Sequence, residues 1–221
     1  MTSLRHRIAT DTRYVLLGLP TAVIAFVLVV TGISAGAGSL VAFVGLPVLA
    51  ATAAMARNFA DVERVLLPEV LGRRLARPRY PQAPDGAGRL RRAVNPLAGG
   101  QAWLDLLHAI IAFPVAIAAF VVTATWWAGA IAGLTFPLYG WMIAGIPDFH
   151  GGLPELLGLS NDTTTFVVFN TVLGVLFALT LVPVVRGAAL IKANLAQALL
   201  TRPVYDEYPA RTSVYRAMAE V

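Results

Sequence analysis

The sequence contains no cysteine in its 221 residues. The protein can therefore form no disulfide, carry no thiolate nucleophile and bind no metal through sulfur. Histidine is almost as scarce, since its three copies, His6, His108 and His150, lie in separate segments without the spacing of metal ligands or of a catalytic pair. Phosphate-binding glycine loops, the zinc-protease pattern His-Glu-x-x-His and nucleophile elbows are also missing. We therefore expect a protein that is not an enzyme, with no catalytic residue, no cofactor and no metal.

Charge is the second scarce property. Only 13% of the residues are charged, whereas 57% are hydrophobic, and the mean hydropathy is +0.71. Residues 14–56, 106–147 and 163–185 contain no Asp, Glu, Lys or Arg, and each stretch reaches or exceeds the roughly 20 residues that cross a bilayer as a helix. This composition excludes an ordinary soluble domain. It predicts an all-α protein, a polytopic bundle of transmembrane helices in the plasma membrane.

The basic residues gather in one long polar segment, residues 57–101. This segment holds nine arginines and four acids, and cationic loops are retained on the cytoplasmic face when a membrane protein inserts. The net charge of +5 does not indicate nucleic-acid binding, because the arginines flank apolar spans instead of lying among exposed aromatic residues. The expected partners are the lipid bilayer and its anionic head groups.

The distribution of charge selects one topology. With four spans at about 14–34, 40–56, 106–126 and 166–185, all 17 basic residues lie on the cytoplasmic side, and the outer segment 147–165 carries acids but no base. Both termini are then cytoplasmic, as are the loop 57–101 and the tail 186–221. Residues 127–146 are uncharged and long enough to cross, but they are rich in glycine and contain Pro137, so we expect a broken or re-entrant apolar segment.

The chain, 1–221, is expected to form a single membrane domain. Residues 1–13 carry three arginines and resemble the start of a signal peptide. We expect them to be retained, because the apolar run that follows is longer than that of a signal peptide.

The first part of the polar loop has helical periodicity. Between Asn58 and Ala76 an apolar stripe follows the helical repeat, although Pro68 interrupts it, and the stripe consists of Phe59, Val62, Leu66 and Val70. This segment either lies along the inner leaflet or is the polar end of the second span. Five arginines are candidates for contact with anionic lipid, or else act only as topology signals during insertion: Arg57, Arg64, Arg73, Arg74 and Arg77.

Two pairs of an acid and a histidine are candidates for sensing. Asp105 and His108 lie one helical turn apart near the inner end of the third span, where an ionisable pair inside the membrane indicates function; the alternative is a pair that reaches the polar interface. Asp148 and His150 lie in the outer segment, where they either respond together to pH or a cation or are simply solvated. The sequence leaves both interpretations of each pair open.

The two halves of the chain share a weak internal similarity. An offset of 94 residues aligns 14–40 with 108–134 and gives seven identities, among them Pro20 with Pro114 and Leu40 with Leu134. A repeat is one mark of transporters, and the alternative is convergence between two stretches of similar composition. The repeat would make 127–146 the counterpart of the second span, which conflicts with the four-span topology.

Several short patterns together resemble a known family. They are YVLLGLP at 14–20, FVLVVTG at 26–32, Gly45-Leu46-Pro47, Arg57, Glu63-Arg64, WLDLL at 103–107, Phe113-Pro114 and Trp126-Trp127. From about Tyr14 to Leu200, the chain resembles the putative sensor domain of actinobacteria. The resemblance implies a membrane input module that precedes a cytoplasmic histidine kinase or occurs alone, with its C-terminal end inside. After Leu200 the sequence shows neither a phosphoacceptor-histidine helix nor ATP-binding glycine boxes, so the chain is a stand-alone member or one from which a kinase was removed.

The leading functional hypothesis is a non-enzymatic membrane sensor that takes part in signal transduction, as in a two-component system. It would pass a membrane or envelope signal to a histidine kinase or another cytoplasmic partner. A small transporter-like protein built from the internal repeat is the alternative, although few polar residues lie in the spans to bind a solute. The sequence leaves a homo-oligomer open in either case.

Overall fold

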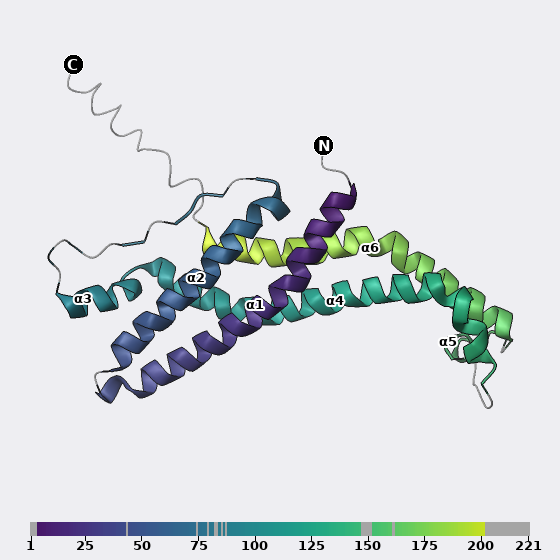
Figure 1. Cartoon of the computed structure of the whole chain (residues 1–221), viewed down its shortest axis with the longest axis horizontal. Coiled ribbons are helices and arrows are strands. Elements are labelled where there is room, and N and C mark those ends of the chain that lie inside the picture. The colour runs from purple at the N-terminus through teal and green to yellow at the C-terminus, as the bar shows by residue number, and fades with distance from the viewer. Residues whose placement is uncertain are drawn as a thin grey trace, which may run out of the picture. The chain divides into compact units, whose positions relative to one another are not determined.

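A computed structural model describes residues 4–42, 44–73, 75–78, 80–81, 84, 86, 88–146, 152–160 and 162–201. Throughout these residues the regular structure is helical, which confirms the all-α prediction for this part of the chain (Figure 1). The elements are α1 (Leu4–Gly38), η1 (Leu40–Ala42), α2 (Gly45–Leu71), α3 (Arg89–Val94), η2 (Asn95–Leu97), α4 (Gly100–Ala144), α5 (Leu153–Leu156) and α6 (Thr163–Leu200), where η marks a 3₁₀ helix.

Within the described residues, three helices are long and apolar enough to cross a membrane, namely α1, α4 and α6. They contain the predicted spans 14–34, 106–126 and 166–185 respectively. The predicted span 40–56 is different, because α2 begins only at Gly45 and meets its first arginine at Arg57. Its uncharged part is about 18 Å long at 1.5 Å per residue, against a hydrocarbon core of about 30 Å. A crossing by α2, and with it the four-span topology, stays a prediction.

The apolar segment 127–146 is not broken as the sequence predicts. Residues 127–144 continue α4, a single helix of 45 residues that contains both Pro114 and Pro137. A proline inside a helix removes one backbone hydrogen bond and bends the helix, and here the helix continues past both prolines. At the end of the aligned stretch the two halves differ, since α1 has ended before Leu40, whereas its counterpart Leu134 lies well inside α4, and the internal repeat stays a hypothesis.

By its backbone contacts the chain divides into two units. Unit 1 comprises residues 1–20 and 114–192, and unit 2 comprises residues 21–113 and 193–221. Helices α1, α4 and α6 each contribute to both units. In α1 and α4 the boundary falls at a proline, because Pro20 is the last residue of its segment of unit 1 and Pro114 is the first residue of the next.

In unit 2, the second part of α1 and α2 form an antiparallel hairpin joined through η1 (Figure 1). Glycines bring the two helices together: a methyl group placed on Gly32 would lie 2.2 Å from Oγ1 of Thr52, and one on Gly36 would lie 2.6 Å from Cγ of Leu49. Small residues are typical of such close packing between membrane helices. The core beside this hairpin also draws on α4 and consists of Ala25, Val29, Ala53, Ala56, Ala102, Leu106 and Ala109.

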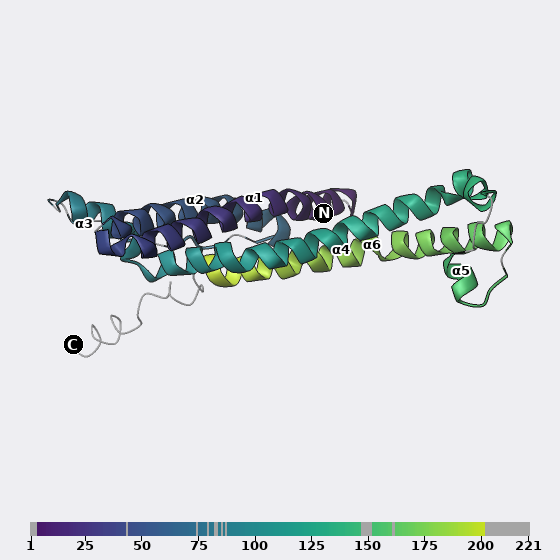
Figure 2. The same ribbon diagram turned by 90° about the horizontal axis from the view of Figure 1, so that it is seen from below.

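In unit 1, α4 and α6 pack backbone against backbone. A methyl group on Gly133 would lie 2.3 Å from the Cα atom of Gly174, and the Trp126 and Phe177 rings meet edge to face with centroids 5.3 Å apart. Helix α5 lies beside the beginning of α6 in both views (Figure 2). That beginning is capped by Asp162, whose carboxylate accepts hydrogen bonds from the Thr165 amide at 3.0 Å and from the Ser160 hydroxyl. These hydrogen bonds lower the pKa of Asp162.

Candidate functional site

The candidate site is built on the polar half of α2. The periodic segment 58–76 is not a separate surface helix, because α2 runs without interruption from Gly45 to Leu71. It ends at Gly72, whose φ of 69° lies in the left-handed region and whose amide donates to the Pro68 carbonyl. Residues 58–71 are therefore the polar continuation of the helix that also holds the apolar residues 45–56, and their position along the inner leaflet stays a prediction.

The buried face of this polar half differs from the predicted apolar stripe. Val62 is 51% exposed, whereas the charged residues Glu63 and Arg64 are buried. The inward face of this part of α2 consists of Ala60, Glu63, Arg64, Leu67 and Val70. Because α2 carries an arginine inward, its guanidinium group must find acceptors within the protein.

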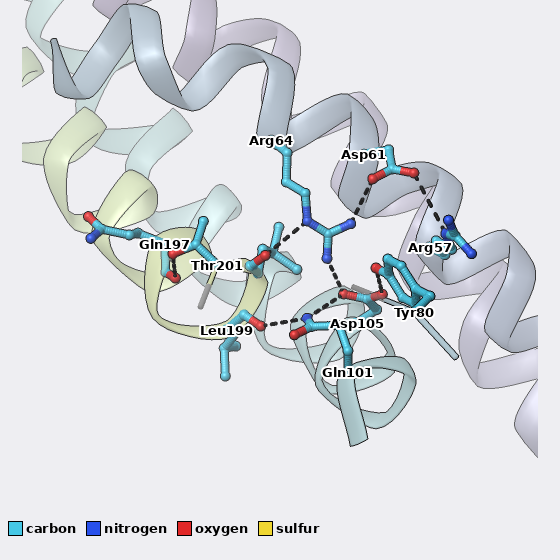
Figure 3. Close-up of polar contacts among 10 residues, drawn as sticks. Arg57, Asp61, Arg64, Tyr80, Gln101, Asp105, Gln197, Leu199 and Thr201 are labelled. Atoms are coloured by element: carbon cyan, nitrogen blue, oxygen red, sulfur yellow. Dashed lines mark hydrogen bonds and ion pairs between the residues drawn. The ribbon is translucent and has the colours of Figure 1, made fainter. Parts of the chain in front are cut away.

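Arg64 has three acceptors within hydrogen-bonding distance (Figure 3). Its Nη2 donates to Oδ1 of Asp105 at 2.6 Å, and its Nη1 donates to Oδ1 of Asp61 at 2.8 Å. Its Nε donates to the backbone carbonyl of Leu200 at 2.9 Å. Only 3% of the Arg64 side chain is exposed. The Arg64 guanidinium group is therefore bonded within the protein, and its contact with lipid stays a prediction.

Asp105 is the acceptor at the centre of the network. Its side chain is fully buried and accepts hydrogen bonds from Arg64, from the Tyr80 hydroxyl at 2.5 Å and from Nε2 of Gln101 at 3.0 Å. A carboxylate with three donors has replaced its water shell with protein. Asp105 therefore points into the protein, and its position relative to the membrane interface stays a prediction. Its neighbour His108, on the same helix, is also largely buried.

The network also holds the end of α6. A helix leaves its last four carbonyl groups without partners of its own, and here two other helices supply donors to two of them. Arg64 bonds the Leu200 carbonyl, and Gln101 bonds the Leu199 carbonyl at 3.1 Å. Nearby, Nη2 of Arg73 donates to Oε1 of Gln197 at 2.8 Å. The last turn of α6 is thereby tied to α2 and α4.

Tyr80 links the network to the loop between α2 and α3. Its hydroxyl bonds Asp105, and the guanidinium group of Arg57 lies 3.7 Å from the centroid of its ring. Burial, together with the hydrogen bond to the Asp105 carboxylate and the charge of that group, raises the pKa of Tyr80 above its usual value. The hydroxyl therefore stays protonated and donates at neutral pH. We define Arg64, Tyr80, Gln101, Asp105 and the carbonyls of Leu199 and Leu200 as the Asp105 network.

The chemistry that this arrangement supports is association of helices. A buried ion pair with a full set of hydrogen bonds becomes strongly destabilising when one partner is lost. The Asp105 network therefore favours a closed arrangement of three helices and one loop. Any change that separates these segments breaks several polar contacts at once.

The sequence indicated some members of this site and missed others. Arg57, Arg64 and Asp105 are brought together, whereas Arg73 and Arg77 are exposed. Three candidate residues, Arg74, Asp148 and His150, lie outside the described residues. Sequence reasoning missed Asp61, Tyr80 and Gln101. Gln101 lies one helical turn before Asp105, which is a usable signal, but no spacing connects Tyr80 with either residue.

A second, smaller polar cluster lies in unit 1. Nη1 of Arg186 bonds Oδ1 of Asp11 at 2.8 Å, and Nζ of Lys192 lies 3.8 Å from the centroid of the Tyr14 ring. Nε1 of Trp127 donates to the hydroxyl of Thr12 at 3.2 Å. These contacts join the first part of α1 to α6 and α4.

Together, the apolar helices and the buried charged contacts between them define an all-helical protein of the membrane type. A comparison with models of known protein families then identifies the family, because the family model described as "Putative sensor" matches residues 14–200. The chain belongs to this putative sensor family. No curated protein and no solved structure matches it.

Proposed function

We propose that this chain is a multi-pass sensor of the plasma membrane, without enzymatic activity, that passes a membrane or envelope signal to a cytoplasmic partner. The Asp105 network carries the proposal, because it fixes the last residues of α6 to α2 and α4 through Arg64 and Gln101. Residue 200 is also where the match to the sensor family ends. Membership of that family and three helices able to cross a membrane support the same conclusion.

The proposed mechanism is a change in the packing of the helices that alters the Asp105 network. A lipid, an apolar molecule or bilayer stress acts on α1, α4 or α6, because these helices expose much apolar surface to their surroundings. A shift of α6 then stretches the bonds to its last two carbonyls. With both termini in the cytoplasm, this end of α6 faces the partner, which we propose to be a histidine kinase or another signalling protein.

A reporter experiment tests this function. In a host strain that lacks the chromosomal copy, the full chain is reintroduced as wild type, Asp105→Asn or Glu155→Gln, and the transcriptional response to an envelope challenge is recorded. Asp105→Asn is expected to lock or abolish the response at a normal level of membrane protein. Glu155→Gln, an exposed change in α5, serves as the control and should respond like wild type.

The contrary outcomes are specific. A wild-type response from Asp105→Asn would remove the Asp105 network from the mechanism. Solute flux through proteoliposomes containing the pure protein, with no effect of the deletion on the envelope response, would replace sensing by transport.

The proposed topology is tested separately by labelling single cysteines, since the native chain offers no competing thiol. Cysteines placed at Gly86 and Ser213 should be protected from an impermeant reagent in intact cells, whereas one at Ser160 should react. Reaction at position 213 with protection at position 160 would overturn the placement of both ends in the cytoplasm.

A further inference from the structure

A cavity of about 300 Å³ lies beside the Asp105 network in unit 2. One wall is the stretch of α2 where its apolar part gives way to charge, and the others come from the loop, from η2 and from the start of α4. Its lining includes Ala53, Arg57, Asn58, Asp61, Tyr80 and Pro96. The cavity is at the lower end of the size range of small-molecule sites and holds roughly ten non-hydrogen groups of the size of water.

Opposite charges face this cavity side by side. Arg57 and Asp61 are one helical turn apart on α2, and their side chains are 50% and 51% exposed. Their nearest charged atoms, Nε of Arg57 and Oδ2 of Asp61, are 3.9 Å apart. Such an exposed pair contributes little to stability. A ligand can therefore separate Arg57 from Oδ2 of Asp61 at little cost, while Oδ1 of Asp61 keeps its hydrogen bond from the buried Arg64.

The charges also select the ligand. A simple anion would be attracted by Arg57 and repelled by Asp61. A simple cation would be attracted by Asp61 and repelled by Arg57. A group that carries an anion and an ammonium a few ångströms apart satisfies both side chains. The alanine and proline residues of the lining then accommodate an apolar portion, and the change from apolar to charged residues along α2 matches that of a lipid at the bilayer surface.

We propose that this cavity binds a phospho-ammonium zwitterion of the phosphoethanolamine type, with the phosphate on Arg57 and the ammonium on Asp61. This inference names the ligand of the proposed sensor and rests on that function only for its biological meaning. Binding would draw Arg57 from the ring of Tyr80, whose hydroxyl bonds Asp105. The ligand would thereby act on the Asp105 network through one side chain.

Binding can be measured on the full chain in an uncharged maltoside detergent. Phosphorus NMR follows three probes: dihexanoyl phosphatidylethanolamine, free O-phosphoethanolamine and dihexanoyl phosphatidylglycerol, which carries the phosphate without the ammonium. The ethanolamine lipid should bind at least about tenfold more tightly than the glycerol lipid, as expected for the loss of one charge-assisted contact. Saturable binding of free phosphoethanolamine would show that the head group is sufficient for binding. Binding of the ethanolamine lipid without binding of free phosphoethanolamine would identify the membrane as the source of the ligand. Both results support the proposed chemistry.

Matched variants locate the site. Arg57→Gln and Asp61→Asn should each weaken binding of the ethanolamine lipid about tenfold, whereas the exposed residues changed in Arg92→Gln and Glu69→Gln lie outside the cavity lining and should leave it unchanged. Circular dichroism confirms that each variant is folded, and Asn58→Ala provides a further variant that removes no charge. Equal binding of the two lipids, or unchanged binding by both Arg57→Gln and Asp61→Asn, overturns the proposal. Neither outcome bears on the envelope response, so the sensor function stands or falls separately.

Discussion

The two units hold buried charge in different ways. In unit 2, Arg64 and Asp105 are 3% and 0% exposed, and the surrounding residues occupy the donors of one and the acceptors of the other. In unit 1, Asp11 is 3% exposed, but its partner Arg186 is 23% exposed. A charge that keeps some contact with water can be rehydrated when its partner is lost, whereas an enclosed charge cannot. Replacing a single charged residue is therefore expected to lower the free energy of unfolding more in unit 2 than in unit 1.

The largest expected effect is that of Asp105→Ala. It leaves Arg64 buried with only Asp61 as counter-charge, so the free energy of unfolding should fall by about 3–5 kcal/mol. Denaturation in mixed micelles, followed by circular dichroism, measures the change.

A double variant provides the control for this prediction. Arg64→Met combined with Asp105→Leu removes both charges and should recover most of the lost stability, because replacing a whole buried pair by apolar groups is often neutral. A double variant that is less stable than Asp105→Ala would show that the remaining polar contacts dominate.

The second effect concerns glycine, and here the loss of stability that cannot be rescued is expected in unit 1. In Gly133→Ala the new methyl group meets backbone of α6 in unit 1, whereas in Gly32→Ala it meets the Thr52 side chain in unit 2. Backbone cannot be removed by a second substitution, so Gly133→Ala should lower the free energy of unfolding by about 1–3 kcal/mol or more without rescue. Gly32→Ala should regain stability when Thr52 is also changed to Ala. Thermal unfolding of the three variants tests this, and a failure of Thr52→Ala to restore stability to Gly32→Ala would contradict the side-chain explanation.

A smaller effect is expected for Tyr80→Phe. It removes one of the three donors to Asp105 and should lower the free energy of unfolding by about 1–2 kcal/mol at neutral pH. The raised pKa of Tyr80 also sets a pH dependence. In the unfolded chain tyrosine loses its proton near pH 10, whereas the folded protein retains it, so this contribution is present below pH 10 and decreases above it. The difference in stability between wild type and Tyr80→Phe should therefore shrink from pH 9 to pH 11, and a constant difference would contradict the raised pKa.

The smallest effect should come from Asp11→Asn in unit 1. The partly exposed Arg186 side chain can turn to water, so the free energy of unfolding should change by only about 1 kcal/mol. Denaturation under the conditions used for Asp105→Ala gives a direct comparison of the two units. A loss as large as that of Asp105→Ala would remove the distinction between them.

Much of the helical content follows from the sequence, because uncharged stretches long enough to span a bilayer must satisfy their backbone groups internally. The spans 14–34, 106–126 and 166–185 lie within observed helices for this reason. The continuity of α4 through Pro137 was not predictable from composition, since glycine and proline indicate a break in most proteins. Only the packing partner α6, with Gly174 against Gly133, distinguishes this segment from a loop.

The candidate site was predictable only in part. Asp105 attracts attention as an acid at the end of an apolar span. Its partners lie 25 and 41 residues away along the chain, at Tyr80 and Arg64, and no local periodicity connects residues at such separations. The arginine that faces inward was indistinguishable by type from those that face outward, because only the packing of α2 decides which face is enclosed.

The prolines at the unit boundaries have a mechanical consequence. Pro20 and Pro114 have no amide hydrogen, so the carbonyls of Leu16 and Ile110 lack the donor that a regular helix would supply at these points. A helix bends most easily where a backbone hydrogen bond is missing. In α1 and in α4, such a bond is missing where the helix passes from one unit to the other. In α6 the boundary follows Lys192, well beyond Pro183. Two of the three shared helices thus lack a backbone hydrogen bond at the boundary, whereas in α6 the hydrogen bond lost at its proline lies within unit 1.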